Sequence, residues 1–202
     1  MQRLYQYQIQ QTIMSKFKDQ YRIASTRLPL FDYSSTGSYF ITICTENRNH
    51  FFGECDNGKM KLSTIGAIVQ GFWYEIPRHF PFITLDEFIV MPNHIHGILI
   101  LNKSEQSTSD NFNINESNEE TKDSFFQKIS PKPGSIPVII RSYKSICTKH
   151  IHAAFSNLNF NWQERFWDTI IDNEASFQNI SNYIINNSAN WKSDKFYNSV
   201  NV

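Results

Sequence analysis

Two histidines that are two residues apart, His94 and His96, are the side chains of this sequence best suited to hold a metal ion. In a β-strand, residues two apart point to the same face, so both imidazoles would aim together while Ile95 points into the opposite layer. Two neighbouring imidazoles can share one divalent cation. The alternative is that both histidines are packing or surface residues, and their spacing alone does not decide between these two interpretations.

Two oxygen-bearing side chains, Tyr183 and Asn187, could complete such a site. They are four residues apart in a stretch with helical periodicity, which predicts Cβ atoms about 5–6 Å from each other on one helix face. Asn187 offers a neutral carbonyl oxygen, and Tyr183 offers a phenol that is a poor nucleophile until it is activated. Tyr143, close to Arg141 and Lys144, is a second candidate nucleophile or a phosphate contact. The spacing does not choose between the two tyrosines, and either could be a core residue.

The elements that must position these residues follow from the apolar periodicity. Strands are predicted at residues 39–45, 82–90 and 94–101. Helices are predicted at about residues 64–76, 135–151 and 173–187, with an extended piece at about 160–166. A tight turn at residues 91–93 should join the last two strands into a hairpin. Strand, helix, hairpin, helix and terminal helix in this order predict an α+β sandwich with an antiparallel sheet.

His150 and His152 repeat the two-residue spacing of the first histidine pair. They fall within a predicted helix, where side chains two residues apart diverge. We therefore expect them to be poor partners for a shared metal ion.

Composition divides the chain into an arm, one domain and an insertion. Residues 1–30 form a polar arm, and residues 31–197 form a single domain of ordinary size. At about residues 102–134 the composition changes to Ser, Asn, Glu, Asp and Lys, which predicts a mobile acidic insertion. Outside residues 104–126 the chain carries 18 Lys and Arg against 13 Asp and Glu. This moderately basic remainder is compatible with a phosphate-bearing partner.

Membrane and secreted classes do not fit the sequence. There is no apolar run long enough to span a bilayer, and the polar N-terminus lacks the apolar core of a signal peptide. Three cysteines without a CxxC spacing favour reduced thiols over a zinc–thiolate site. We therefore expect a cytoplasmic protein with no membrane partner.

Five stretches of the sequence resemble, in the right order, motifs of the REP-associated tyrosine transposases, a branch of the single-tyrosine HUH transposases. The stretches are DYSSTGSYFITICT (residues 32–45), MPNHIHGI (91–98), IRSYKS (140–145), WQERFWD (162–168) and NYIINN (182–187). The resemblance covers about residues 20–197 apart from the acidic insertion, and five ordered motifs make it specific. One departure is Ser188, where the family usually has proline, so the last helix is free to continue for another turn.

The resemblance implies a role for each candidate. His94 and His96 match the metal-binding pair, Tyr183 matches the catalytic tyrosine, and Asn187 matches the third metal ligand. The implied cofactor is Mg²⁺ or Mn²⁺, and two nitrogen ligands suit Mn²⁺ better. The implied reaction is cleavage and rejoining of single-stranded, hairpin-forming DNA through a 5′-phosphotyrosine. The implied fold is a ferredoxin-like antiparallel sheet with helices packed on one face and a C-terminal helix that carries Tyr183.

Further basic and aromatic side chains are candidates for DNA contacts. The basic candidates are Arg22, Arg27, Arg141, Lys144 and Lys149. The aromatic candidates for stacking on unpaired bases, which could equally be core residues, are Trp162, Phe166 and Trp167.

Three functions stay open at this point. The first is an active transposase-like endonuclease and strand transferase, and the second is a domesticated DNA-binding protein that recognises repeat hairpins without mobilising them. The third is a replication initiator, against which the small size and the lack of a helicase segment weigh. The residues proposed for catalysis fit the first two equally, and they fit a monomer and a homodimer equally.

Overall fold

The computed structural model describes residues 16–17, 20–21, 31–103 and 131–197. The chain divides into two compact units, Met1–Phe31 and Asp32–Val202. In the first unit, strand β1 (Lys16–Phe17) pairs antiparallel with β2 (Gln20–Tyr21). Arg22, Arg27 and most of the predicted insertion lie outside the described residues.

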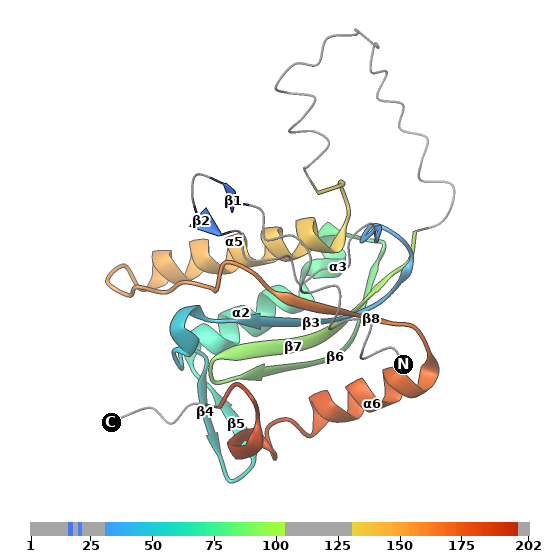
Figure 1. Ribbon diagram of the computed structural model, residues 1–202. Helices are drawn as coiled ribbons and strands as arrows, with labels where there is room; N and C mark the ends of the chain where they lie inside the picture. Colours follow the sequence, from blue (N-terminus) through green and yellow to red (C-terminus); the bar gives the residue numbers. More distant parts are fainter. Residues whose placement is uncertain (1–15, 18–19, 22–30, 104–130, 198–202) are drawn as a thin grey trace, which may run out of the picture. The chain divides into compact units, whose positions relative to one another are not determined.

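Four antiparallel strands form the central sheet of the second unit, in the order β6–β7–β3–β8 (Figure 1). Their bounds are Gly37–Cys44 for β3, Ile83–Met91 for β6, His94–Leu101 for β7 and Trp167–Ile171 for β8. A turn at Pro92 and Asn93 joins β6 to β7, with Met91 paired to His94. The predicted hairpin is therefore present, and β7 lies inside the sheet between β6 and β3.

Helices α2 (Thr64–Tyr74), α3 (Ile76–His79) and α5 (Ile136–Ala154) lie on one face of this sheet (Figure 1). Ser63 begins α2 by accepting a hydrogen bond from the Gly66 amide at 3.1 Å, a typical N-cap contact. One helix follows β3 and another follows β7, so the chain runs strand, helix, strand, strand, helix, strand. This order and the sheet topology confirm the predicted ferredoxin-like α+β fold.

Trp73 of α2 lies at the centre of the core between these helices and the sheet. It is fully buried and stacks on Phe88, with ring centroids 4.6 Å apart. A Cβ atom at Gly97 of β7 would lie 2.3 Å from Trp73 Cζ2. Gly97 therefore lets the indole lie directly on the backbone of the strand that carries the histidine pair.

Helix α6 (Glu174–Ile185) packs on the other face of the sheet (Figure 1). Ile184 joins Ile98 of β7 and Ile171 of β8 in a second, smaller cluster, with Phe177 and Ile180 against it. These residues form the apolar stripe that the sequence predicts. The helix ends at Ile185 in spite of Ser188, and the chain turns through residues 186–190 into a 3-10 turn at Trp191–Ser193.

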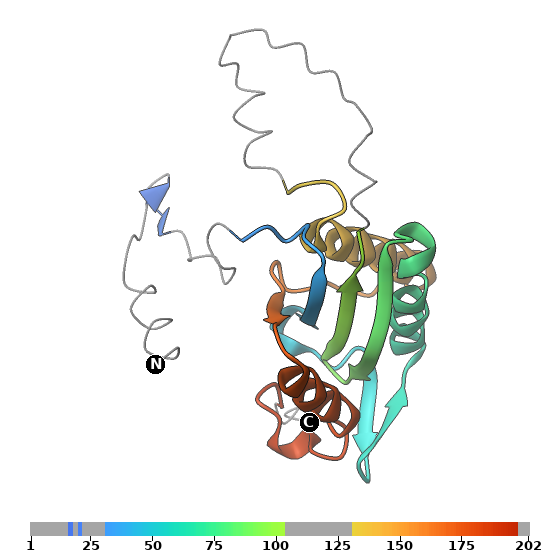
Figure 2. The same ribbon diagram turned by 90° about the vertical axis from the view of Figure 1, so that its right-hand side faces the viewer.

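Two further elements are not predicted by the apolar pattern. Strands β4 (Gly53–Asp56) and β5 (Lys59–Leu62) form a separate hairpin that extends beyond the sheet (Figure 2). Strand β8 forms the edge of the sheet just after the extended piece predicted at residues 160–166. Of the helices that the structure describes, none is both long enough and apolar enough to traverse a bilayer.

Candidate functional site

His94 and His96 lie next to each other on β7, in the interior of the sheet. Their ring centroids are 4.5 Å apart, and both side chains are completely buried. Ile95 packs in the opposite core, under α2 and α5, as the alternation of a strand requires. The two imidazoles thus share the face covered by α6.

Asn93 orients the His94 ring. Its Nδ2 donates hydrogen bonds to the backbone oxygens of Arg48 at 3.2 Å and Phe196 at 2.9 Å, so its Oδ1 is left as an acceptor. His94 Nδ1 lies 2.8 Å from this oxygen, which assigns the ring proton to Nδ1 and the lone pair to Nε2. Hydrogen bonds of this kind fix the tautomer of metal-binding histidines.

The Nε2 atoms of the two histidines converge. His94 Nε2 and His96 Nε2 are 3.1 Å apart, and Thr42 Oγ1 lies 2.8 Å from His96 Nδ1. Burial, followed by the charges of Lys195 and Arg48, lowers the pKa of His94 to about 3. Burial, followed by the charge of His94, holds the pKa of His96 well below its usual range. Both rings are therefore neutral at pH 7, as a metal ligand must be.

Tyr183 and Asn187 reach the histidines from α6 and the turn that follows it. Tyr183 Oη lies 3.1 Å from His96 Nε2 and donates a hydrogen bond to Asp194 Oδ2 at 3.0 Å. Asn187 Nδ2 donates to the same carboxylate oxygen at 3.1 Å. The phenol also meets Phe40 of β3 edge to face, with ring centroids 6.1 Å apart. The two side chains that the sequence pairs by helical spacing thus lie beside the histidine pair.

The Tyr183 phenol is protonated in this arrangement. Burial and then the negative charge of Asp194 raise its pKa above the usual value of 10.0. The residue is nevertheless 39% exposed, in contrast to the two buried histidines. Solvent therefore approaches the cluster from the side of the tyrosine, and the phenol needs activation before it can act as a nucleophile.

Residues 191–197 cover the rest of the cluster. The Phe196 ring lies 4.7 Å from the His94 ring and 5.9 Å from the His96 ring, centroid to centroid. Trp191 lies 6.0 Å from His94 by the same measure. Asp194 Oδ1 accepts a hydrogen bond from the Phe196 amide at 2.6 Å, which holds the covering segment in a tight turn.

The donor set fits a divalent cation. His94, His96 and Asp194 each offer one ligand atom, and these atoms all lie within 4.8 Å of one another. Asn187 Oδ1 is buried and accepts no hydrogen bond from any residue that the structure describes. A buried acceptor without a donor is unfavourable unless a water molecule or a cation satisfies it. Neutral imidazoles combined with carboxylate and amide oxygens form a donor set that a divalent cation can use.

Tyr143, the other candidate nucleophile, lies in the core under α2 and α5. It is 3% exposed, and its hydroxyl donates a hydrogen bond to the Val69 backbone oxygen at 2.9 Å. Burial raises its pKa well above the usual value. The structure therefore separates Tyr143 from the histidine pair by the thickness of the sheet.

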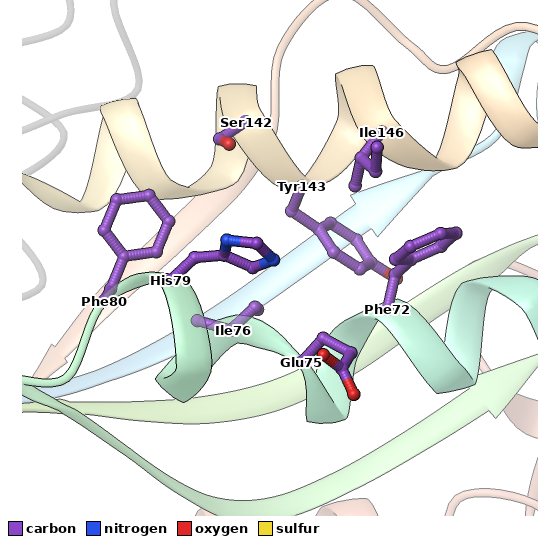
Figure 3. A pocket seen from close by; sticks show the side chains of 8 residues that line it. All are labelled: Phe72, Glu75, Ile76, His79, Phe80, Ser142, Tyr143 and Ile146. Carbon is purple, nitrogen blue, oxygen red and sulfur yellow. The ribbon is translucent and has the colours of Figure 1, made fainter.

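A cavity lies beside Tyr143, between α5 and the α2–α3 region (Figure 3). Its volume is about 120 Å³, and Figure 3 shows Glu75, His79 and Ser142 as its polar side chains beside the tyrosine. The Tyr143 hydroxyl is already engaged with the backbone of α2. This cavity thus lacks the convergent ligand atoms of the histidine site.

The basic residues predicted on α5 also lie on the face away from the histidines. Arg141 and Lys149 are exposed. Lys144 instead donates hydrogen bonds to the backbone oxygens of Gln163 at 2.6 Å and Glu164 at 3.2 Å. Lys144 therefore ties α5 to the segment before β8, and none of the three is next to Tyr183.

The three aromatic candidates for base stacking have different surroundings. Trp162 and Phe166 are 9% and 7% exposed and belong to the main core. Trp167 on β8 is 39% exposed and lies 5.9 Å from the Phe196 ring. Only Trp167 of these three has a substantial surface for a ligand.

Two members of the cluster, Asn93 and Asp194, carry no role in the sequence-based prediction. Asn93 stands inside the MPNHIHGI octet, so its place next to His94 was a usable signal. Asp194 follows the last predicted helix without any periodic pattern, and only the fold of residues 191–197 brings it to the tyrosine. No local signal in the sequence indicates it.

Comparison with known proteins gives one relative by sequence and two similar solved structures. No protein-family model matches the chain. An uncharacterized protein of Haemophilus influenzae is 34% identical over 176 residues, which span 86% of this chain and 92% of that protein. The solved structure of a REP-associated tyrosine transposase bound to a REP hairpin is similar with a TM-score of 0.50. It is 18% identical, and the match covers 86% of this chain and 77% of that one.

A candidate transposase from Deinococcus radiodurans matches more weakly, with a TM-score of 0.44 and 14% identity over 75% of this chain and 91% of that one. The likeness to the hairpin-bound structure agrees with the fold that the sequence resemblance implied. The chain belongs to one family with the Haemophilus influenzae protein, and its fold is that of the REP-associated tyrosine transposases.

Proposed function

We propose that this chain is a transposase-like DNA endonuclease and strand transferase that uses Tyr183 as its nucleophile. The proposal depends mainly on one contact: the Tyr183 hydroxyl lies 3.1 Å from Nε2 of His96. His96 and its neighbour His94 are both buried and neutral. The shared fold supports it, because the transposase of that fold was solved with a REP hairpin. The proposed substrate is accordingly single-stranded DNA that forms a hairpin.

The reaction needs one nucleophile and one proton acceptor from the chain. The Tyr183 oxygen attacks the phosphorus in line, the bond to the 3′ oxygen breaks, and a 5′-phosphotyrosine and a free 3′-hydroxyl result. Asp194 Oδ2, 3.0 Å from the phenol, receives its proton, and the departing 3′ oxygen takes one from water. Because a phenolate is a better leaving group than an alkoxide, a 3′-hydroxyl can reverse the step and rejoin the strand.

His94, His96 and Asn187 are the proposed ligands of a divalent cation, and the Asp194 carboxylate beside them adds a negative charge near it. Such a cation would polarise the scissile phosphate and stabilise the charge that develops on its oxygens. Asn93 and Thr42 hold the two imidazoles with Nε2 facing inward. The proposed cation is Mn²⁺ or Mg²⁺.

Both histidines are 0% exposed, so a phosphate cannot reach them while residues 191–197 cover them. We infer that this segment shifts when DNA binds, with entry beginning at the exposed Tyr183. A cytoplasmic setting also belongs to the proposal. Its support is that Cys44, Cys55 and Cys147 are all free thiols.

The test incubates the full chain with end-labelled hairpin oligonucleotides and Mn²⁺ or Mg²⁺. A protein–DNA adduct that survives denaturation is expected for the wild type and absent for Tyr183→Phe. Tyr143→Phe is the matched control, which loses one buried hydrogen bond worth about 1 kcal/mol of stability but keeps the adduct. Hairpin binding with no adduct at either metal would instead favour a DNA-binding protein without strand transfer.

A further inference from the structure

Trp167 points to the same side of the sheet as the histidine pair. It is paired with Thr42 across β8 and β3, and Thr42 is paired with His96 across β3 and β7. Paired residues of antiparallel strands project their side chains to the same face. Trp167 is therefore in one row with His96 at a distance of two strand spacings, roughly 10 Å.

The surroundings of Trp167 leave part of the ring open. Phe196 supports it, with ring centroids 5.9 Å apart and planes inclined by 50°. The residue remains 39% exposed because β8 is the edge strand of the sheet. The indole therefore offers an aromatic face on which a flat ligand can stack.

Two cations lie on the same Phe196 ring. Lys195 Nζ is 4.8 Å from its centroid, and the Arg48 guanidinium carbon is 5.3 Å away. Arg48 Nη1 also donates to the Lys195 backbone oxygen at 3.2 Å, which joins the two segments. Asn47 and Arg48 both have a left-handed backbone, with φ of 55° and 56°, although neither is glycine. Backbone strain of this kind is concentrated at functional sites.

We propose that Trp167 and Lys195 form a nucleotide subsite beside the tyrosine, in which an unpaired base stacks on the indole and its phosphate pairs with the ammonium group. The inference rests on the proposed function and adds the position of the strand to it. An aromatic face next to a cation is the combination by which single-stranded DNA is bound. The subsite puts the strand on the α6 face, away from Arg141 and Lys149 on α5.

The experiment measures binding of single-stranded oligonucleotides in the Tyr183→Phe background, so that the DNA stays intact. Trp167→Ala should weaken binding about 5- to 150-fold, the range found for loss of one stacked base. Trp167→Phe, which keeps an aromatic face, should retain most of the affinity. Tyr74→Ala removes an aromatic residue that is 58% exposed on α2, and it should leave the affinity unchanged.

A series of oligonucleotides, each with one abasic position, then identifies the stacked base. At one position near the cut, removal of the base should weaken binding by the parent protein. With that oligonucleotide, the parent protein and the Trp167→Ala variant should bind with equal affinity. A Trp167→Ala defect of equal size at every abasic position would overturn the stacking role. Failure of the parent protein to bind single strands at all would contradict the proposed function itself.

Salt dependence tests the phosphate contact. Lys195→Gln should reduce the slope of log affinity against log salt by about 0.7, the value for one phosphate contact on a single strand. Lys149→Gln on α5 is the control and should leave the slope unchanged. If the salt slope fell only in Lys149→Gln, the DNA strand would lie on the α5 face of the sheet. That result would overturn the proposed subsite.

Discussion

Each face of the sheet carries a tyrosine and a pair of histidines, but only the α6 face brings them together. His94 and His96 are on a strand, so their rings converge, with Nε2 atoms 3.1 Å apart. His150 and His152 have the same spacing on α5, where residues two apart diverge. His150 packs on Phe72 at 4.8 Å between centroids, and His152 Nε2 lies 2.9 Å from the Phe160 backbone oxygen.

The comparison also extends to the buried polar atoms. On the α2–α5 face the indole nitrogens of Trp73 and Trp162 are buried without a hydrogen-bond partner among the described residues. Those atoms are N–H donors, which a cation cannot satisfy. On the α6 face the Asn187 Oδ1 acceptor lies beside the histidine pair. The hydroxyls of Ser135, at the start of α5, and of Ser181, on α6, also have no hydrogen-bond partner among the described residues, so the difference between the faces lies in the acceptor next to the histidines.

The largest expected effect is a difference in cleavage rate between substitutions in the two histidine pairs, His94 and His96 on β7 and His150 and His152 on α5. His96→Ala should slow cation-dependent strand cleavage about 100-fold or more, because it removes a ligand of the ion that stabilises the transition state. His150→Ala should keep the cleavage rate within about 2-fold, because His150 is exposed on α5 and its ring contacts the half-buried Phe72. Single-turnover cleavage of labelled hairpin DNA measures both. Equal losses in the two variants would abolish the distinction between the faces.

A smaller effect is expected at Asn93, which acts through His94. Asn93→Ala should lower Mn²⁺ affinity about 10- to 100-fold, as loss of a hydrogen bond to a metal-binding histidine does. In the metal-free protein, the nitrogen NMR shifts of His94 should change from the Nδ1–H tautomer toward a mixture. Asn102→Ala, which removes an exposed hydrogen bond to Thr84 at the far end of the hairpin, is the control. Unchanged affinity together with an unchanged tautomer would rule out the positioning role.

The third prediction concerns stability without a change in the chemistry. Gly97→Ala should reduce the free energy of unfolding by about 1–3 kcal/mol, because its Cβ would collide with Trp73 in the packed core. Gly71→Ala in α2 meets no atom within 4 Å and should stabilise the protein by about 0.5–1 kcal/mol. Urea unfolding measures both changes. A stable Gly97→Ala protein would show that the indole does not fix this strand.

Most of the fold follows from the sequence because its elements have strong local patterns. The strand at residues 39–45, the hairpin around residues 91–93 and the three long helices are all found close to where periodicity puts them. Strand β8 is missed because it is stabilised by pairing with β3, more than 120 residues earlier in the chain, at a half-exposed edge. The end of α6 at Ile185 also departs from the expectation based on Ser188.

The candidate site also has some features that local spacing predicts and others that only the folded chain creates. The shared direction of His94 and His96 depends on the geometry of one strand, so spacing predicts it. Tyr183 and Asn187 also lie together as predicted, but Asn187 lies in the turn after α6 and not on the helix itself. The choice of Tyr183 over Tyr143 needed the family resemblance, because both tyrosines have amphipathic helical surroundings. Asp194 depends on hydrogen bonds from Tyr183 and Asn187 in a segment without periodicity. Contacts of that kind exist only in the folded chain.

Mapping the tyrosine that becomes attached to DNA tests the central claim most directly. After reaction with a hairpin and Mn²⁺, nuclease trimming and trypsin digestion, the peptide of residues 166–192 contains Tyr183 and no other tyrosine. Tyr143 falls in the separate peptide of residues 142–144. We predict a nucleotide mass on the 166–192 peptide, located at Tyr183 by fragmentation. A nucleotide on the 142–144 peptide instead would contradict the assignment of the active face.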